Sequence, residues 1–87
     1  MKNVTIVVAI VNNDNLSEIR NCLTSIDTNL FEVIVVSPKK YHKSIKELFD
    51  KEIKFSMPFC DQTSIRGLWR QGEEYAITHW VVFIQSS

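Results

Sequence analysis

The sequence predicts an α/β domain in which helices cover both faces of a parallel β-sheet. Short runs of β-branched and apolar residues alternate along the 87 residues with stretches of helical periodicity. The connections are short, and no repeat, low-complexity tract or linker divides the chain. The resulting order, βαβαβαβ, requires parallel pairing through right-handed crossovers. We therefore expect a single domain over residues 1–87.

Composition excludes several classes of protein. A hydrophobic content of 45% favours a folded chain, and ten basic against ten acidic residues leave no net charge, which disfavours nucleic-acid binding. No apolar run approaches the ~20 residues of a membrane span. Cys22 and Cys60 are far apart and have no metal-binding spacing, so we expect two buried thiols and a cytoplasmic location.

The first predicted unit is a strand followed by a helix. Residues 4–11, VTIVVAIV, have the composition of a central parallel strand. Asn15 and Glu18 fit a capping box, so a helix should begin there and continue to about Asp27. Its apolar face is formed by Leu16, Ile19, Leu23 and Ile26.

The second unit has the same form. Residues 31–36, FEVIVV, predict a buried strand, and Ser37-Pro38 predict the N-cap and first residue of a helix to about Lys51. Tyr41, Ile45, Leu48 and Phe49 lie on one face of it. Residues 53–57, IKFSM, alternate in polarity and predict a third strand at an edge of the sheet.

The last helix and strand complete the pattern. Thr63 or Ser64 should cap a helix whose apolar face is formed by Ile65, Leu68, Trp69, Gly72 and Ala76. Residues 80–84, WVVFI, have no polar face, which predicts a strand covered on both sides. The whole is a three-layer, Rossmann-like arrangement with strand order 3-2-1-4 and two helices on one face. The reversal of strand order then brings Asn12 near Gln85, where open α/β sheets bind ligands.

Familiar catalytic motifs are missing. The chain has neither GxGxxG after the first strand nor GxxxxGK[ST], and Met57-Pro58 stand where a receiver domain would carry its phosphorylated Asp. Cys60 as a nucleophile would need a neighbouring base. His42 and His79 are expected at a solvent-facing helix and a strand entrance, so a buried thiol is the preferred interpretation of Cys60.

One resemblance covers most of the chain. The segments VTIVVAIVNN, NCLTSI, FEVIVVS and VVFIQSS, with Gly72 and Ala76 four residues apart, resemble the amino-terminal, nucleotide-binding half of family 2 glycosyltransferases of GT-A fold. The positions that match the family pattern are Asn12, Cys22, Leu23, Ser25, Ile26, Gly72 and Ala76.

The resemblance implies a set of site residues, and several of them depart from the family. By family position the nucleotide-sugar site comprises Ala9, Val11, Asn12, Ser37, Gln85 and Ser87. Ser37-Pro38 replace an acidic pair, and Gln85-Ser86-Ser87 replace Asp-x-Asp. Because Mg²⁺ or Mn²⁺ requires anionic oxygen ligands, we expect no metal site, no catalytic residue and no cofactor. The acceptor-binding half of the family is also absent from these residues.

Several groups of residues have two possible roles. Asn12–Asn15 form either a turn with a helix cap or a surviving nucleotide contact. The four lysines of the second helix, Lys39, Lys40, Lys43 and Lys46, form a solvated face or a phosphate-binding patch. Arg66 and Arg70 either reach a diphosphate or lie at the surface, and Trp69 and Trp80 belong to the core or stack on a ligand.

Two hypotheses for function follow. The first is a glycosyltransferase-like domain that is incomplete or inactive by itself and binds a nucleotide-sugar weakly, so the sequence leaves open whether the chain is an enzyme. The second is a degenerate scaffold that acts through protein contacts. The closing strand presents an apolar edge, where a second copy or the missing carboxyl-terminal half would pair.

Overall fold

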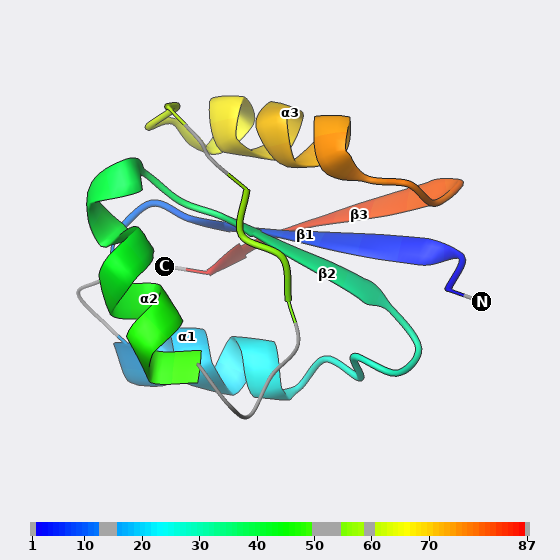
Figure 1. Cartoon of the computed structure of the whole chain (residues 1–87), viewed down its shortest axis with the longest axis horizontal. Coiled ribbons are helices and arrows are strands. Elements are labelled where there is room, and N and C mark those ends of the chain that lie inside the picture. The colour runs from blue at the N-terminus through cyan, green and yellow to red at the C-terminus, as the bar shows by residue number, and fades with distance from the viewer. Residues whose placement is uncertain (1, 13–15, 50–54, 59–60, 87) are drawn as a thin grey trace.

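The described part of the chain folds into a parallel β-sheet between two helical layers. A computed structural model of the 87-residue chain describes residues 2–12, 16–49, 55–58 and 61–86. The strands are β1 (Val4–Ile10), β2 (Glu32–Val36) and β3 (Trp80–Ser86), paired in parallel in the order β2-β1-β3 (Figure 1). The α/β class, the parallel sheet and the relative order of these strands are thus confirmed.

The helices cover the two faces as predicted. On one face lie α1 (Leu16–Thr24) and α2 (His42–Phe49), and on the other lies α3 (Ile65–Tyr75) (Figure 1). Because successive side chains of a strand point to opposite faces, β1 divides its apolar residues between two cores. Ile6, Val8 and Ile10 pack on the α1 side, and Val7 and Ala9 pack on the α3 side.

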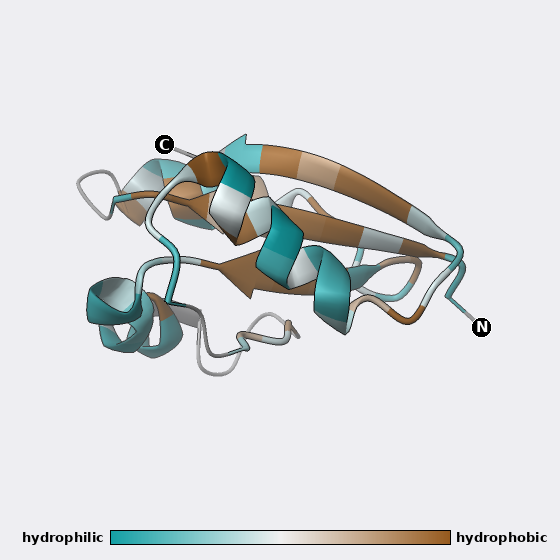
Figure 2. Ribbon diagram, turned by 90° about the horizontal axis from the view of Figure 1, so that it is seen from above, coloured by the Kyte–Doolittle hydropathy of each residue, from teal (hydrophilic) through white to brown (hydrophobic). Residues whose placement is uncertain are grey.

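The central strand is the most deeply buried element. Five of its side chains, Val7, Val8, Ala9, Ile10 and Thr5, have no exposed surface. The hydroxyl of Thr5 satisfies its hydrogen-bonding potential by lying 2.6 Å from the hydroxyl of Thr78 and donating to the carboxylate of Glu32 at 3.2 Å. These contacts join the amino-terminal ends of the sheet through side chains, whereas Figure 2 shows that the strands themselves are predominantly hydrophobic.

The predicted third strand is reduced to a single bridge. Ser56 pairs with Ile34 of β2, accepting a hydrogen bond from the Val35 N–H (2.8 Å) and donating one to the Val33 carbonyl (2.9 Å). Ile53 and Lys54 lie outside the described residues. The position of Ser56, on the outer side of β2, agrees with the predicted order. The alternating pattern of residues 53–57 correctly indicated an edge, but the described part of this segment forms no strand.

The start of the second helical segment was predicted wrongly. Ser37 is not an N-cap and Pro38 is not the first helical residue: Pro38 has ψ of 141° and caps a short 3-10 helix, η1 (Lys39–Tyr41), which leads into α2. The Ser37 hydroxyl points to the Pro38 carbonyl at 3.4 Å, and the ring of His42 donates from Nε2 to the Ser37 carbonyl at 2.9 Å. His42 is consequently half-buried, in contrast to the solvent-facing position expected for it.

The ends of the other helices differ in smaller ways. Helix α1 ends at Thr24 instead of about Asp27, and the hydroxyls of Thr24 and Ser25 donate to the carbonyls of Arg20 and Cys22. The predicted cap at Asn15 lies outside the described residues. Ser64 caps α3 as predicted, accepting from the Gly67 N–H at 3.1 Å, whereas Ala76 lies just beyond the helix as its C-cap. None of the described helices is long and apolar enough to cross a membrane.

The prediction that β3 is covered on both sides was wrong. It is the outermost of the described strands, and it leaves exposed 68% of Trp80, 46% of Val82 and 41% of Phe83. Helix α3 packs mainly over β1 and β2, so its layer does not extend across β3. An unbroken apolar run indicates burial only if both neighbouring layers reach that strand.

Candidate functional site

The predicted site lies where the parallel strands end. Pairing places Ala9 opposite both Val36 and Gln85, so Ser37, Gln85 and the residues after β1 share the carboxyl edge of the sheet. Strand β1 continues into Val11 and Asn12, while Ser86 pairs with Ile10. The sheet thus brings five of the six predicted positions to one edge, and Ser87 lies outside the described residues.

Burial divides these positions into two groups. Ala9 and Ser37 have no exposed surface, so their side chains belong to the interior. Val11 and Asn12 are half-buried, and Gln85 is exposed. A ligand at this edge would therefore meet the side chains of Val11, Asn12 and Gln85 and the backbone beside Ser37.

The predicted site has no charged side chain at its five described positions. Its described side chains are apolar, hydroxyl or amide groups, which offer dipoles but no carboxylate. A divalent cation that bridges a diphosphate needs anionic oxygens, so these residues do not fit a Mg²⁺ or Mn²⁺ site. Within residues 2–12, 16–49, 55–58 and 61–86, no group of three or more His, Cys, Asp or Glu side chains could hold a metal ion. Cys22 is a half-buried free thiol, and Cys60 lies outside the described residues.

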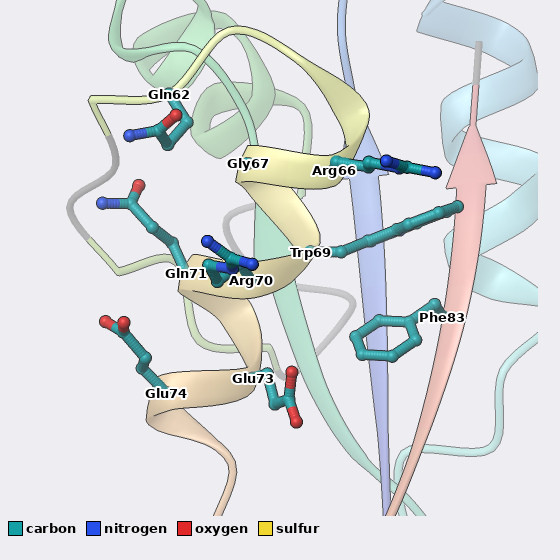
Figure 3. A pocket seen from close by; sticks show the side chains of 9 residues that line it. All are labelled: Gln62, Arg66, Gly67, Trp69, Arg70, Gln71, Glu73, Glu74 and Phe83. Carbon is teal, nitrogen blue, oxygen red and sulfur yellow. The ribbon is translucent and has the colours of Figure 1, made fainter.

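A hollow of the described surface lies elsewhere, over α3 and beside β3. It encloses about 620 Å³, and Figure 3 shows Arg66, Trp69, Glu73 and Phe83 on its β3 side. The Trp69 and Phe83 rings lie 5.5 Å apart, and the Trp69 indole N–H donates to the Ile84 carbonyl at 3.2 Å. Trp69 is therefore fixed against the strand, which favours the core interpretation of this residue over a free stacking surface.

The last strand has the apolar edge that the sequence predicts, and several of its side chains are exposed, which the sequence did not predict. We call the exposed apolar side chains of the last strand, Trp80, Val82 and Phe83, the β3 surface. Ile77 and Tyr75, just before the strand, are also exposed. The uniform hydrophobicity of residues 80–84 predicted burial of both faces. Phe83 lies on the α3 side of the sheet and Trp80 and Val82 lie on the α1 side, and neither helical layer covers β3 fully.

The hydrogen-bond pattern identifies which backbone groups lie at the outer edge of β3. The Trp80 N–H donates to the Asn3 carbonyl at 3.4 Å, so Trp80 directs its backbone groups toward β1. In a parallel ladder every second residue does the same. The N–H and C=O groups of Val81, Phe83 and Gln85 therefore point away from the sheet.

Comparison with known proteins gives no further assignment. No protein-family model, no curated protein and no solved structure matches the chain significantly. What is established is a small α/β domain with a three-stranded parallel sheet among its described residues and exposed apolar side chains on β3.

Proposed function

We propose that this chain acts as a protein-association scaffold that self-associates through β3. The observation that carries the proposal is the β3 surface, where Trp80, Val82 and Phe83 adjoin outward-facing backbone groups. Edge strands of soluble proteins are usually shortened, charged or covered, because an open edge invites another strand to pair. β3 runs over seven residues, WVVFIQS, without one charged residue. The strand thus lacks the common devices that prevent pairing.

The opposite side of the sheet supports a closed assembly. The outer side of β2 is partly occupied by Ser56, which uses the Val35 N–H and the Val33 carbonyl. After pairing through β3, the remaining sheet edge is that of β2, which Ser56 partly blocks, so the expected product is a dimer.

Phe83→Glu should abolish self-association without unfolding the chain. Its side chain is 41% exposed on the outer strand, so the charge can remain hydrated in the monomer but would be desolvated in a paired edge. Sedimentation velocity over a range of protein concentrations should show a reversible dimer for the wild type and a monomer for this variant.

Leu30→Glu provides the matched control. Leu30 is also an exposed apolar residue, at 62%, but it lies in the turn before β2, away from β3. The Leu30→Glu variant should therefore dimerise like the wild type. A wild type that stays monomeric at submillimolar concentration, or a dimer that Phe83→Glu leaves intact, would refute association through β3.

A second candidate function is weak binding of a nucleotide or nucleotide-sugar by a family 2 glycosyltransferase-like fold. It is favoured by the strand order, which places the reversal between β1 and β3 and gathers Val11, Asn12 and Gln85 at the carboxyl edge. Arg66 lies beside the end of β3 in Figure 3 and would add positive charge for a diphosphate. In this view the chain lacks transferase activity by itself.

Titration with UDP and UDP-sugars, followed by ¹H–¹⁵N NMR, should shift the signals of Val11, Asn12 and Gln85. Because the described positions Val11, Asn12, Ser37 and Gln85 offer no carboxylate to a cation, the same affinity is expected with Mg²⁺ and with EDTA. ATP at equal concentration distinguishes a general phosphate effect from recognition of uridine. If the signals of these three residues do not move at millimolar UDP, nucleotide binding at this edge is excluded.

A further inference from the structure

We infer that two copies pair their β3 strands antiparallel, about a two-fold axis at Phe83, and that Arg66 of each copy forms an ion pair with Glu73 of the other. This inference rests on the self-association proposed above and specifies its register. Four features of one copy determine it: the direction of the edge groups, the faces of the side chains, the direction of α3 and the placement of its charges.

The edge groups select the register. In an antiparallel ladder, residues directly opposite each other either exchange both backbone hydrogen bonds or exchange none, in alternation. With the axis at Phe83, this residue faces its own copy and Val81 faces Gln85. All outward N–H and C=O groups of Val81, Phe83 and Gln85 then find partners. An axis at Val82 would pair Val81 with Phe83 and leave Gln85 opposite His79, beyond the end of the strand.

The side chains agree with this register. Residues opposite each other in an antiparallel pair lie on the same face. Phe83 therefore meets Phe83 of the other copy on the α3 side, next to Trp69. On the α1 side, Val82 meets Ile84 of the other copy. The two β3 surfaces would thus cover each other, including the exposed side chains of Val82 and Phe83.

The direction of α3 brings opposite charges together. Figure 3 shows α3 running opposite to β3, with Arg66 beside the end of the strand and Glu73 toward its beginning. Trp69, which contacts Phe83 and Ile84, lies between them. Arg66 precedes Trp69 by about 4.5 Å along the helix axis and Glu73 follows it by about 6 Å. A two-fold axis near Trp69 therefore places Arg66 of one copy level with Glu73 of the other.

The helix periodicity separates these two charges from a third. Residues seven apart, such as Arg66 and Glu73, project in nearly the same direction, whereas Arg70 is rotated further from the sheet. In Figure 3, Arg66 and Trp69 extend toward β3, Glu73 lies on the same side of the helix, and Arg70 remains over the helix. Within one copy, Arg66 and Glu73 are about 10.5 Å apart along the helix axis, which is too far for a direct ion pair between them. Their pairing thus requires a second copy.

Charge reversal tests the register. Arg66→Glu alone and Glu73→Arg alone should each weaken the dimer about tenfold, because each places like charges opposite one another. Sedimentation velocity measures the dissociation of each dimer.

The same substitutions in combination provide the rescue. A mixture of the two single variants should form a heterodimer, since one copy then presents Glu at both positions and the other presents Arg at both. The double variant Arg66→Glu/Glu73→Arg should dimerise like the wild type, because its charges are exchanged on both sides of the axis. Arg70→Glu, which changes the net charge equally on the same helix, is the control and should leave the dimer unchanged.

The outcomes separate this inference from the proposal on which it rests. A dimer that depends on Phe83 but not on Arg66 or Glu73 would overturn the two-fold register and retain self-association through β3. A chain that is monomeric throughout would overturn both. Weakening by the single reversals together with rescue in the mixture and in the double variant is the result expected for the register.

Discussion

Gly72→Ala should destabilise the fold by about 2 kcal/mol, although alanine favours a helix more than glycine by about 1 kcal/mol. Gly72 lies on the face of α3 that contacts the sheet and is fully covered. A Cβ at this position would meet Val7 Cγ1 at 2.5 Å and Val36 Cγ1 at 3.2 Å. Val7 and Val36 are themselves buried in the strands, so neither can move aside without disturbing the sheet.

Gly67→Ala is the matched control on the same helix. A Cβ there would meet the side chain of Gln62, whose amide oxygen lies 2.5 Å away. Gln62 is exposed, and its side chain can rotate into solvent. The higher helix propensity of alanine should therefore largely offset the cost of moving Gln62. The free energy of unfolding from urea titrations should change by less than about 1 kcal/mol for Gly67→Ala. Equal effects of the two substitutions would contradict the close approach of α3 to β1 and β2 at Gly72.

Leu68→Ala should destabilise the chain by about 3 kcal/mol, within the range for a fully buried leucine. Leu68 has no exposed surface and packs in the α3-side core with Val7, Ala9, Ile34 and Val36. It lies one helical turn before Gly72, so the two positions define one contact: the leucine fills the space beside the sheet, and the glycine permits the approach. Removal of the side chain leaves a cavity between rigid strands, which can close only partly.

Thermal and urea unfolding measure this effect, and Leu68→Met is the control. Methionine keeps most of the volume and should cost less than about 1.5 kcal/mol. Leu30→Ala, at an exposed turn position, should change the free energy of unfolding by less than about 0.5 kcal/mol. If Leu68→Ala unfolds with the same midpoint as Leu30→Ala, α3 does not contribute its apolar face to the core as described.

The sequence alone determined the elements and their connections. The β-branched runs of β1 and β2 and the apolar positions Ile19, Leu23 and Leu68 have periods characteristic of strand and helix, which are local properties of the chain. Ser64 was predictable as a cap because a hydroxyl just before an apolar helical pattern has few other local roles. Short crossovers then fixed parallel pairing, the order of the described strands and the faces on which the helices lie.

The candidate site could be predicted only as a location. Strand order brings Ala9, Val11, Asn12, Ser37 and Gln85 to one edge, as expected. Their accessibility was not readable from the sequence: Ser37 is fully buried because the chain continues through Pro38 into η1, and His42 bonds to its carbonyl. Whether a nucleotide binds at this edge remains a prediction.

The tertiary structure decided the role of the last strand. Trp80, Val82 and Phe83 satisfy every sequence criterion for a buried parallel strand, since apolar patterning reports that a side chain avoids water but not what covers it. On the side of Phe83, the covering layer is α3, which lies mainly over β1 and β2, where Gly72 allows it to approach Val7 and Val36. On the side of Trp80 and Val82, the covering layer is α1, which also makes few contacts with β3. The sequence thus determined that β3 is apolar, and the packing of the two helical layers left that strand exposed at the edge.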